Sequence, residues 1–145
     1  MSLAVLKSRA LAGMEAPEVS VEVHLANGLP SFTIVGLPDT EVKESRDRVR
    51  AALQNCGFEM PARRITANLA PADLPKESGR FDLPIALGIL AASGQLPGDQ
   101  LHHYEFAGEL SLSGQLRPIR GALAMTFAMQ RSPATGRRRP GCPAQ

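Results

Sequence analysis

The feature that most constrains the fold is a short apolar segment that follows a loop rich in charge, proline and glycine. Residues 85–92 carry only apolar side chains and glycine, so a helix there has no polar face and must be buried. Asp82 offers the side-chain oxygen wanted at a helix N-cap, Pro84 suits a first turn, and Gly94 stands where a left-handed C-cap residue is expected. The segment is far shorter than the roughly 20 apolar residues of a membrane span. We therefore predict a core helix and no membrane partner.

Alternating apolar and polar side chains predict strands with one buried face earlier in the chain. The predicted strands cover residues 1–11, 19–25, 31–34 and 64–69. We expect the second and third of these to pair as an antiparallel hairpin, because Asn27-Gly28 is a tight-turn dipeptide. Leu29-Pro30 lengthens that connection.

A helical pattern and a second hairpin complete the predicted elements. Residues 38–55 place apolar side chains on one helical face and charged ones on the rest, with Glu44 and Arg48 spaced as an i,i+4 pair. A hairpin is expected around residues 113–114, and a last helix over residues 121–131. This order predicts an α/β (α+β) domain with a mixed sheet and helices packed on it.

Composition and length agree with one compact domain. A chain of 145 residues with 43% hydrophobic residues can bury a single core, which we assign to residues 1–131. Residues 132–145 are rich in Pro, Gly and Arg without any period, and we predict that they are disordered. The net charge of +2 includes three arginines at residues 137–139, so the body is nearly neutral. Cys56 and Cys142 are interpreted as reduced thiols of a cytoplasmic protein.

Several segments together resemble one known family. They are EVHLANGLPSFTIVGLPDT, VKESRDRVRAAL, ITANLAPADLPKE, FDLPIALGIL and GELSLSGQLRPIRG. From about Ser2 to Arg131 the chain resembles the N-terminal, Lon-protease-like and magnesium-chelatase-ChlI-like domain of the ComM/YifB family of AAA+ ATPases. The resemblance implies the ribosomal protein S5 domain 2-like fold. It also implies that this chain is truncated before the ATPase domain.

The resemblance carries expectations about function. Full-length relatives are expected to be hexameric motors that act on DNA, in branch migration during natural transformation and recombination, with ATP and Mg²⁺ held by the ATPase domain. This chain has no GxxxxGK[ST] phosphate-binding loop, so we expect no cofactor and no ATP hydrolysis in this fragment. We expect a noncatalytic accessory domain whose partners are the ATPase domain, a homo-hexamer in the full-length context, and DNA. One alternative is an accessory domain of a motor that inserts magnesium into a porphyrin.

The other alternative is a Lon-like serine peptidase. Such an enzyme needs a serine that is activated by a lysine, because an ordinary hydroxyl must lose its proton to attack a carbonyl. The resemblance places the nucleophile position at Asp82 and the lysine position at Met125. Both members of the pair are missing, so peptidase activity is disfavoured and no catalytic residue is predicted.

Charged residues of the loop and of one strand start form the predicted partner or DNA surface. An exposed loop with both charge signs suits a partner surface, although its side chains could equally satisfy the loop's own backbone. The strand-start arginines could contact phosphate or could be polar edge positions. The candidates are Arg63, Arg64, Asp73, Lys76, Glu77 and Arg80. No metal site is predicted, because the three histidines are better explained as separate surface side chains.

Overall fold

A computed structural model describes residues 2–11, 15–74, 76 and 79–118. The helix predicted over residues 121–131, the tail predicted over 132–145 and the residue Met125 lie outside the described residues. The domain boundary at residue 131 therefore stays a prediction.

Four strands form one mixed sheet. They are β1 (Leu3–Arg9), β2 (Glu18–Ala26), β3 (Ser31–Val35) and β4 (Arg64–Ala70), in the spatial order β1-β2-β4-β3. β2 runs antiparallel to both of its neighbours, and β3 runs parallel to β4. Every second residue of β2 and β4 is buried, as the alternation predicted. The mixed sheet confirms the predicted fold class.

The predicted hairpin between the second and third strands is wrong. β2 and β3 run in opposite directions, but β4 lies between them and hydrogen-bonds to both. The connection of residues 27–30 is exposed, and Gly28 within it has φ 138°. It crosses the N-terminal end of β4 to reach β3 and does not close a two-residue turn. The alternation in β4 indicated only a strand with one buried face, and it carried no information about which neighbours that strand would have.

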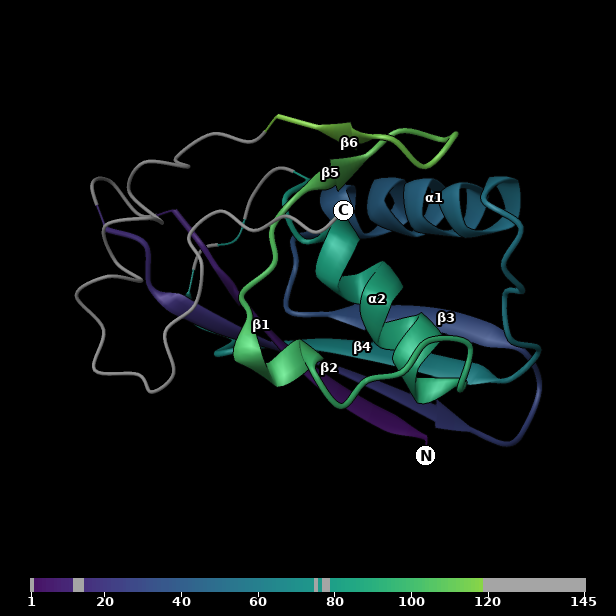
Figure 1. Cartoon of the computed structure of the whole chain (residues 1–145). Coiled ribbons are helices and arrows are strands. Elements are labelled where there is room, and N and C mark those ends of the chain that lie inside the picture. Colours follow the sequence, from purple (N-terminus) through teal and green to yellow (C-terminus); the bar gives the residue numbers. More distant parts are fainter. Residues whose placement is uncertain (1, 12–14, 75, 77–78, 119–145) are drawn as a thin grey trace.

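Both helices cover the same face of the sheet (Figure 1). The predicted amphipathic helix is α1 (Asp39–Asn55), which ends before Gly57 at φ 87°, and the predicted apolar helix is α2 (Asp82–Ala92), which ends before Gly94 at φ 79°. A 3-10 helix, η1 (Leu101–His103), follows. No helix among the described ranges has the length and apolarity that crossing a bilayer requires.

The predicted second hairpin is present as two short strands. β5 (Glu109–Leu110) pairs antiparallel with β6 (Leu116–Arg117), and Gly114 in the turn has φ 95°. Asn55 Nδ2 donates a hydrogen bond of 2.8 Å to the Leu112 carbonyl, so the hairpin is attached to the end of α1. Figure 1 shows the hairpin on the far side of α1 from the sheet.

The closest approach of α2 to the sheet occurs at Gly88. A Cβ atom built on Gly88 would lie 2.5 Å from Val23 Cγ2 and 3.3 Å from Leu6 Cδ1. Both of those residues are fully buried in the core, where a β-branched side chain has little freedom to move away. Glycine is therefore required here because the helix backbone packs directly on β2.

We predict that Gly88→Ala destabilises the domain although alanine is the better helix former. The propensity gain is about 1 kcal/mol, whereas overpacking a tight core costs about 1–3 kcal/mol. The net loss is measurable as a lower urea midpoint with an unchanged m-value.

The double variant Val23→Ala/Gly88→Ala separates this cause from a general effect on the helix. Val23→Ala alone leaves a void, and the alanine methyl at position 88 should fill part of it, so the two changes should be less than additive. Strict additivity would contradict the packing explanation.

Candidate functional site

The charged group at the centre of the fold is the carboxylate of Asp82. Asp82 is the first residue of α2, and its exposed fraction is 1%. The prediction that Asp82 is the N-cap is wrong, because Phe81 holds that place and makes no side-chain capping bond. The carboxylate instead points away from its own helix end toward α1 and β5.

Each oxygen of this carboxylate accepts two hydrogen bonds. Oδ1 accepts from Ser45 Oγ at 2.7 Å and from Arg48 Nη2 at 3.3 Å. Oδ2 accepts from Arg48 Nε at 2.6 Å and from the Leu110 backbone N–H at 3.1 Å. A carboxylate offers about four lone-pair positions, so this one has no accepting capacity left for a further ligand.

Burial and pairing act in opposite directions on the two charges. Burial raises the pKa of the Asp82 carboxyl above its ordinary value, although hydrogen bonds from Arg48 and Ser45 and the charge of Arg48 act to lower it. For Arg48, burial acts to lower the pKa, but the hydrogen bond and charge of Asp82 raise it, with help from Glu109 and Glu44. The guanidinium therefore stays charged beside a carboxyl that ionises less readily than a free one.

Arg48 connects the buried carboxylate to the surface of α1. Arg48 Nη1 lies 3.8 Å from Glu44 Oε1, which confirms the predicted i,i+4 pair. Its stronger partner is nevertheless Asp82, which is 34 positions further along the chain. Sequence spacing on α1 identified the weaker contact only, because the stronger one depends on how the two helices pack.

Lys76, predicted to lie on an exposed partner surface, is buried. Its exposed fraction is 2%, and Nζ donates to the carbonyls of Pro71 at 2.6 Å and Leu74 at 2.9 Å. These carbonyls belong to a loop that forms no strand ladder, and the Pro71 carbonyl otherwise accepts only a long bond of 3.5 Å from the Leu74 N–H among the described residues, so the ammonium group is the closer donor. Burial lowers the pKa of Lys76, against the opposing charge of Asp73.

Arg80 is also buried, with an exposed fraction of 2%, so its prediction as a surface residue is wrong as well. Its Nη1 donates to the Arg9 carbonyl at 3.5 Å, and its own carbonyl accepts from the Gly108 N–H at 2.8 Å. Arg9 in turn forms a two-bond ion pair with Glu105 at 2.7 and 3.0 Å. This arrangement joins the end of β1 to the loop and to the segment before β5.

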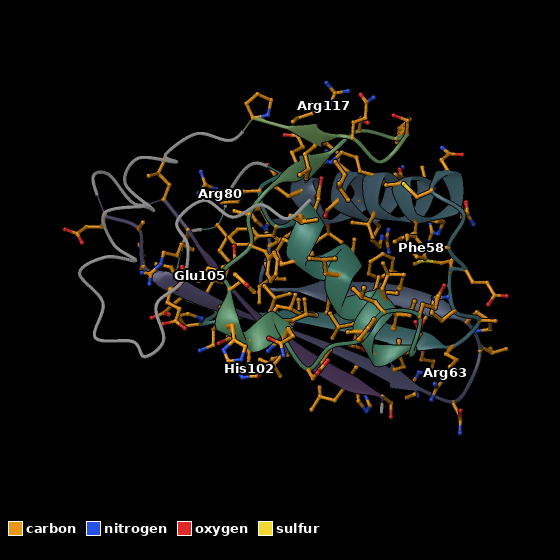
Figure 2. The ribbon with its side chains drawn as sticks, viewed as in Figure 1. Phe58, Arg63, Arg80, His102, Glu105 and Arg117 are labelled. Carbon is orange, nitrogen blue, oxygen red and sulfur yellow. The ribbon has the colours of Figure 1, made fainter. Side chains whose placement is uncertain are left out.

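The remaining predicted surface residues do not converge with these two. Asp73 is exposed, and Glu77 lies outside the described residues. Arg64 is exposed and Arg63 is half-buried at the start of β4. Figure 2 shows Arg63 at the lower right and Arg80 well apart from it at the upper left, so the six predicted residues do not form one surface.

Ser45 lies on the buried face of α1 with Val49, Ala52 and Leu53, and no prediction included it in the site. A hydroxyl in an otherwise apolar stripe signals a buried polar partner, and that signal was present. The Leu110 N–H and the Arg9–Glu105 pair had no comparable local signal. Within the part of the chain that the structure describes, no three His, Cys, Asp or Glu side chains lie close enough together to hold a metal ion.

We predict that the order of stability among variants of Asp82 depends on hydrogen-bond capacity. Asp82→Ala leaves the buried Leu110 N–H and Arg48 Nε without their acceptor and should cost about 3 kcal/mol. Asp82→Asn should cost less, about 2 kcal/mol, because its oxygen can replace Oδ2 and its amide can donate to the Ser45 hydroxyl, while the ion pair and the acceptor for Arg48 Nη2 are lost. Urea unfolding measures both.

The control is Asp47→Ala on the exposed face of α1. Asp47 forms only exposed ion pairs, with Lys43 at 3.2 Å and Arg50 at 3.9 Å, so its loss should change stability by less than about 1 kcal/mol. Equal losses of unfolding free energy for Asp82→Ala and Asp47→Ala would contradict the conclusion that Asp82 holds α1, α2 and β5 together.

We predict that the carboxyl carbon of Asp82, followed by ¹³C NMR, titrates with a midpoint above the ordinary value of about 3.9. The folded chain then holds this proton more tightly than the unfolded chain does. The pH-dependent part of this group's contribution to stability is therefore fully present below the ordinary Asp pKa and is lost as pH rises through the folded-state pKa, while the hydrogen bonds that the carboxylate accepts remain. A midpoint below the ordinary value would show that pairing with Arg48 outweighs burial.

Comparison with known proteins identifies relatives over most of the chain. The family described as subunit ChlI of Mg-chelatase matches residues 21–136. Competence protein ComM of Haemophilus influenzae is 61% identical over 132 residues, which are 91% of this chain and 26% of that protein. YifB of Escherichia coli is 58% identical over 124 residues, 86% of this chain and 24% of that protein.

A more distant relative is an uncharacterised protein of Mycobacterium tuberculosis, 42% identical over 131 residues, 90% of this chain and 26% of that protein. This chain thus spans about a quarter of the length of the curated relatives that it matches. The resemblance inferred from the motifs is confirmed, and the chain belongs to the family of subunit ChlI of Mg-chelatase, with ComM and YifB among its relatives.

Proposed function

We propose that this chain is a noncatalytic accessory domain of a ComM/YifB-type, magnesium-chelatase-like AAA+ ATPase that acts on DNA in the cytoplasm. Its 61% identity to a protein named for competence supports a role in the uptake or recombination of DNA. ATP and Mg²⁺ would be bound by the ATPase domain of the same protein. The domain would contribute contacts to that ATPase domain, to neighbouring subunits of a hexamer, or to DNA.

The observation that carries the noncatalytic part of the proposal is the state of Asp82. The resemblance to Lon aligns this residue with a nucleophile that must meet a substrate carbonyl. Here the carboxylate is 1% exposed and both of its oxygens accept two hydrogen bonds. A group so enclosed cannot approach a substrate without breaking the contacts that join α1, α2 and β5. The Lon-like peptidase is therefore disfavoured on geometry as well as on residue type.

A second candidate function is an accessory role in a motor that inserts magnesium into a porphyrin. The specific observation in its favour is the match of residues 21–136 to the family of subunit ChlI of Mg-chelatase. Against it stands the identity of 61% to ComM and 58% to YifB over most of this chain. We therefore place it second.

The test is a titration of fluorescently labelled single-stranded and branched DNA with the 145-residue chain, repeated at raised salt. We expect binding that weakens as salt rises, because phosphate contacts release counterions. Labelled casein should be turned over no faster than in buffer. A porphyrin titration should leave the absorption spectrum of the pigment unchanged.

Each arm can overturn a part of the proposal. Salt-insensitive or absent DNA binding at high protein concentration would confine the domain to protein contacts. Casein hydrolysis that Asp82→Asn abolishes without unfolding the chain would support the Lon-like peptidase as the function. A saturable porphyrin spectrum would favour the magnesium-inserting motor.

A further inference from the structure

We propose that the end of the sheet where the β2–β3 loop meets the start of β4 is the surface that binds nucleic acid. In this arrangement Arg63 and Arg64 contact backbone phosphates, and Leu29 acts as an apolar wedge at an unstacked base step. The inference rests on the proposed DNA function and adds to it a site and a mode of contact. It also assigns a role to the exposed loop of residues 27–30, which the predicted hairpin treated as a turn only.

The two arginines at this end are held by backbone contacts and not by acidic side chains. The Ser31 N–H donates to the Arg63 carbonyl at 3.2 Å, and Ser31 is paired in register with Arg64. Within the described residues, neither guanidinium group makes an ion pair or a side-chain hydrogen bond. Arginine presents a planar fork of donors that matches a phosphate, so two unengaged guanidinium groups favour a polyanionic partner.

Gly28 fixes the position of Arg64 relative to the loop. A Cβ atom on Gly28 would lie 2.6 Å from Arg64 Cδ, and the backbone there has φ 138°. The stem of Arg64 therefore packs directly over the loop backbone. Because the loop and this arginine are in contact, a ligand that reaches the guanidinium also meets the neighbouring Leu29.

Leu29 is the most exposed large apolar side chain of the described chain, with an exposed fraction of 86%. Pro30 follows it and fixes one backbone torsion angle, so the side chain stands on a restrained connection. Proteins that bend or unstack DNA insert apolar wedges such as leucine beside arginines that hold the phosphates. Leu29 on the loop and Arg64 on β4, whose side chain packs against that loop at Gly28, provide both parts.

Two guanidinium groups of α1, those of Arg46 and Arg50, lie near Phe32 of the edge strand β3. Arg46 Nη1 donates to the Phe32 carbonyl at 3.1 Å, and the Arg50 guanidinium lies 6.0 Å from the centre of the Phe32 ring. Asp47 partly neutralises Arg50, at 3.9 Å. Both arginines lie close to Phe32, the β3 residue that pairs with Ile65 just after Arg64, while Figure 2 labels Arg63 at the same end of β4.

The test is fluorescence anisotropy with labelled 20-base-pair DNA, either continuous or with a central nick, at four salt concentrations. The probe length is about two helical turns. Arg63→Gln/Arg64→Gln should remove two phosphate contacts and lower the salt slope by about 1.8, so that a fourfold rise in salt weakens wild type about 12-fold more than the variant.

The matched control is Lys7→Gln/Lys43→Gln. It removes the same charge from lysines that are already paired, with Glu18 at 2.8 Å and Asp47 at 3.2 Å.

Leu29→Ser tests the wedge separately. Unstacking is easiest where the strand is interrupted, so wild type should prefer nicked over continuous DNA, and Leu29→Ser should lose that preference while keeping the salt slope. The control is Leu112→Ser on the β5–β6 hairpin, an apolar side chain with 56% exposure on another part of the molecule.

The outcomes separate this inference from the proposed function. Salt-sensitive binding by wild type that survives Arg63→Gln/Arg64→Gln, or that falls equally in the lysine control, overturns this surface and leaves the DNA function standing. Absence of salt-sensitive binding by wild type overturns both and leaves an acidic protein as the partner to test. Loss of the nick preference in Leu112→Ser as well as in Leu29→Ser would rule out the wedge.

Discussion

The carboxylate of Asp82 joins three elements that come from distant parts of the chain. It binds Ser45 and Arg48 on α1, begins α2, and accepts the Leu110 N–H of β5. Without it, the polar atoms of three packed surfaces would face one another in a core that excludes water. The apolar contacts of α2 with the sheet determine where that helix lies. The buried carboxylate determines how α1 and the hairpin are oriented around it, which nondirectional apolar packing alone does not specify.

Local patterns in the sequence were sufficient to predict most of the elements. The alternation in β2 and β4, the apolar face of α1 and the all-apolar α2 each follow from side chains near one another in sequence, and the structure confirms them. The pairing of strands was not local. An antiparallel direction for β2 and β3 followed from a short connection, but the insertion of β4 between them depends on a strand about thirty residues later. No turn residue encodes that choice.

The charged loop shows the same limit for the candidate site. Its composition indicated exposure, and the alternative that its side chains satisfy its own backbone was equally compatible with the sequence. The structure favours the alternative at Lys76, because a loop without ladder partners has carbonyls that need donors. Arg80 is buried against the end of β1 for a related reason, since its side chain donates to the Arg9 carbonyl. Whether a cationic side chain is exposed to solvent or donates to backbone carbonyls depends on tertiary packing, which composition alone does not determine.

This distinction changes how the net charge of the chain should be understood. A net charge of +2 predicts no strong electrostatic field around the protein. Several cations also contribute little to the surface because their side chains are buried. Arg48 is paired with Asp82 and Arg9 with Glu105, while Lys76 serves carbonyl groups. Among the described residues, Arg63 and Arg64 at the start of β4 are cations that no ion pair engages. A nearly neutral domain can still present a local surface for a polyanion where neighbouring cations have no acidic partner, and in the described part of the chain the start of β4 is such a place.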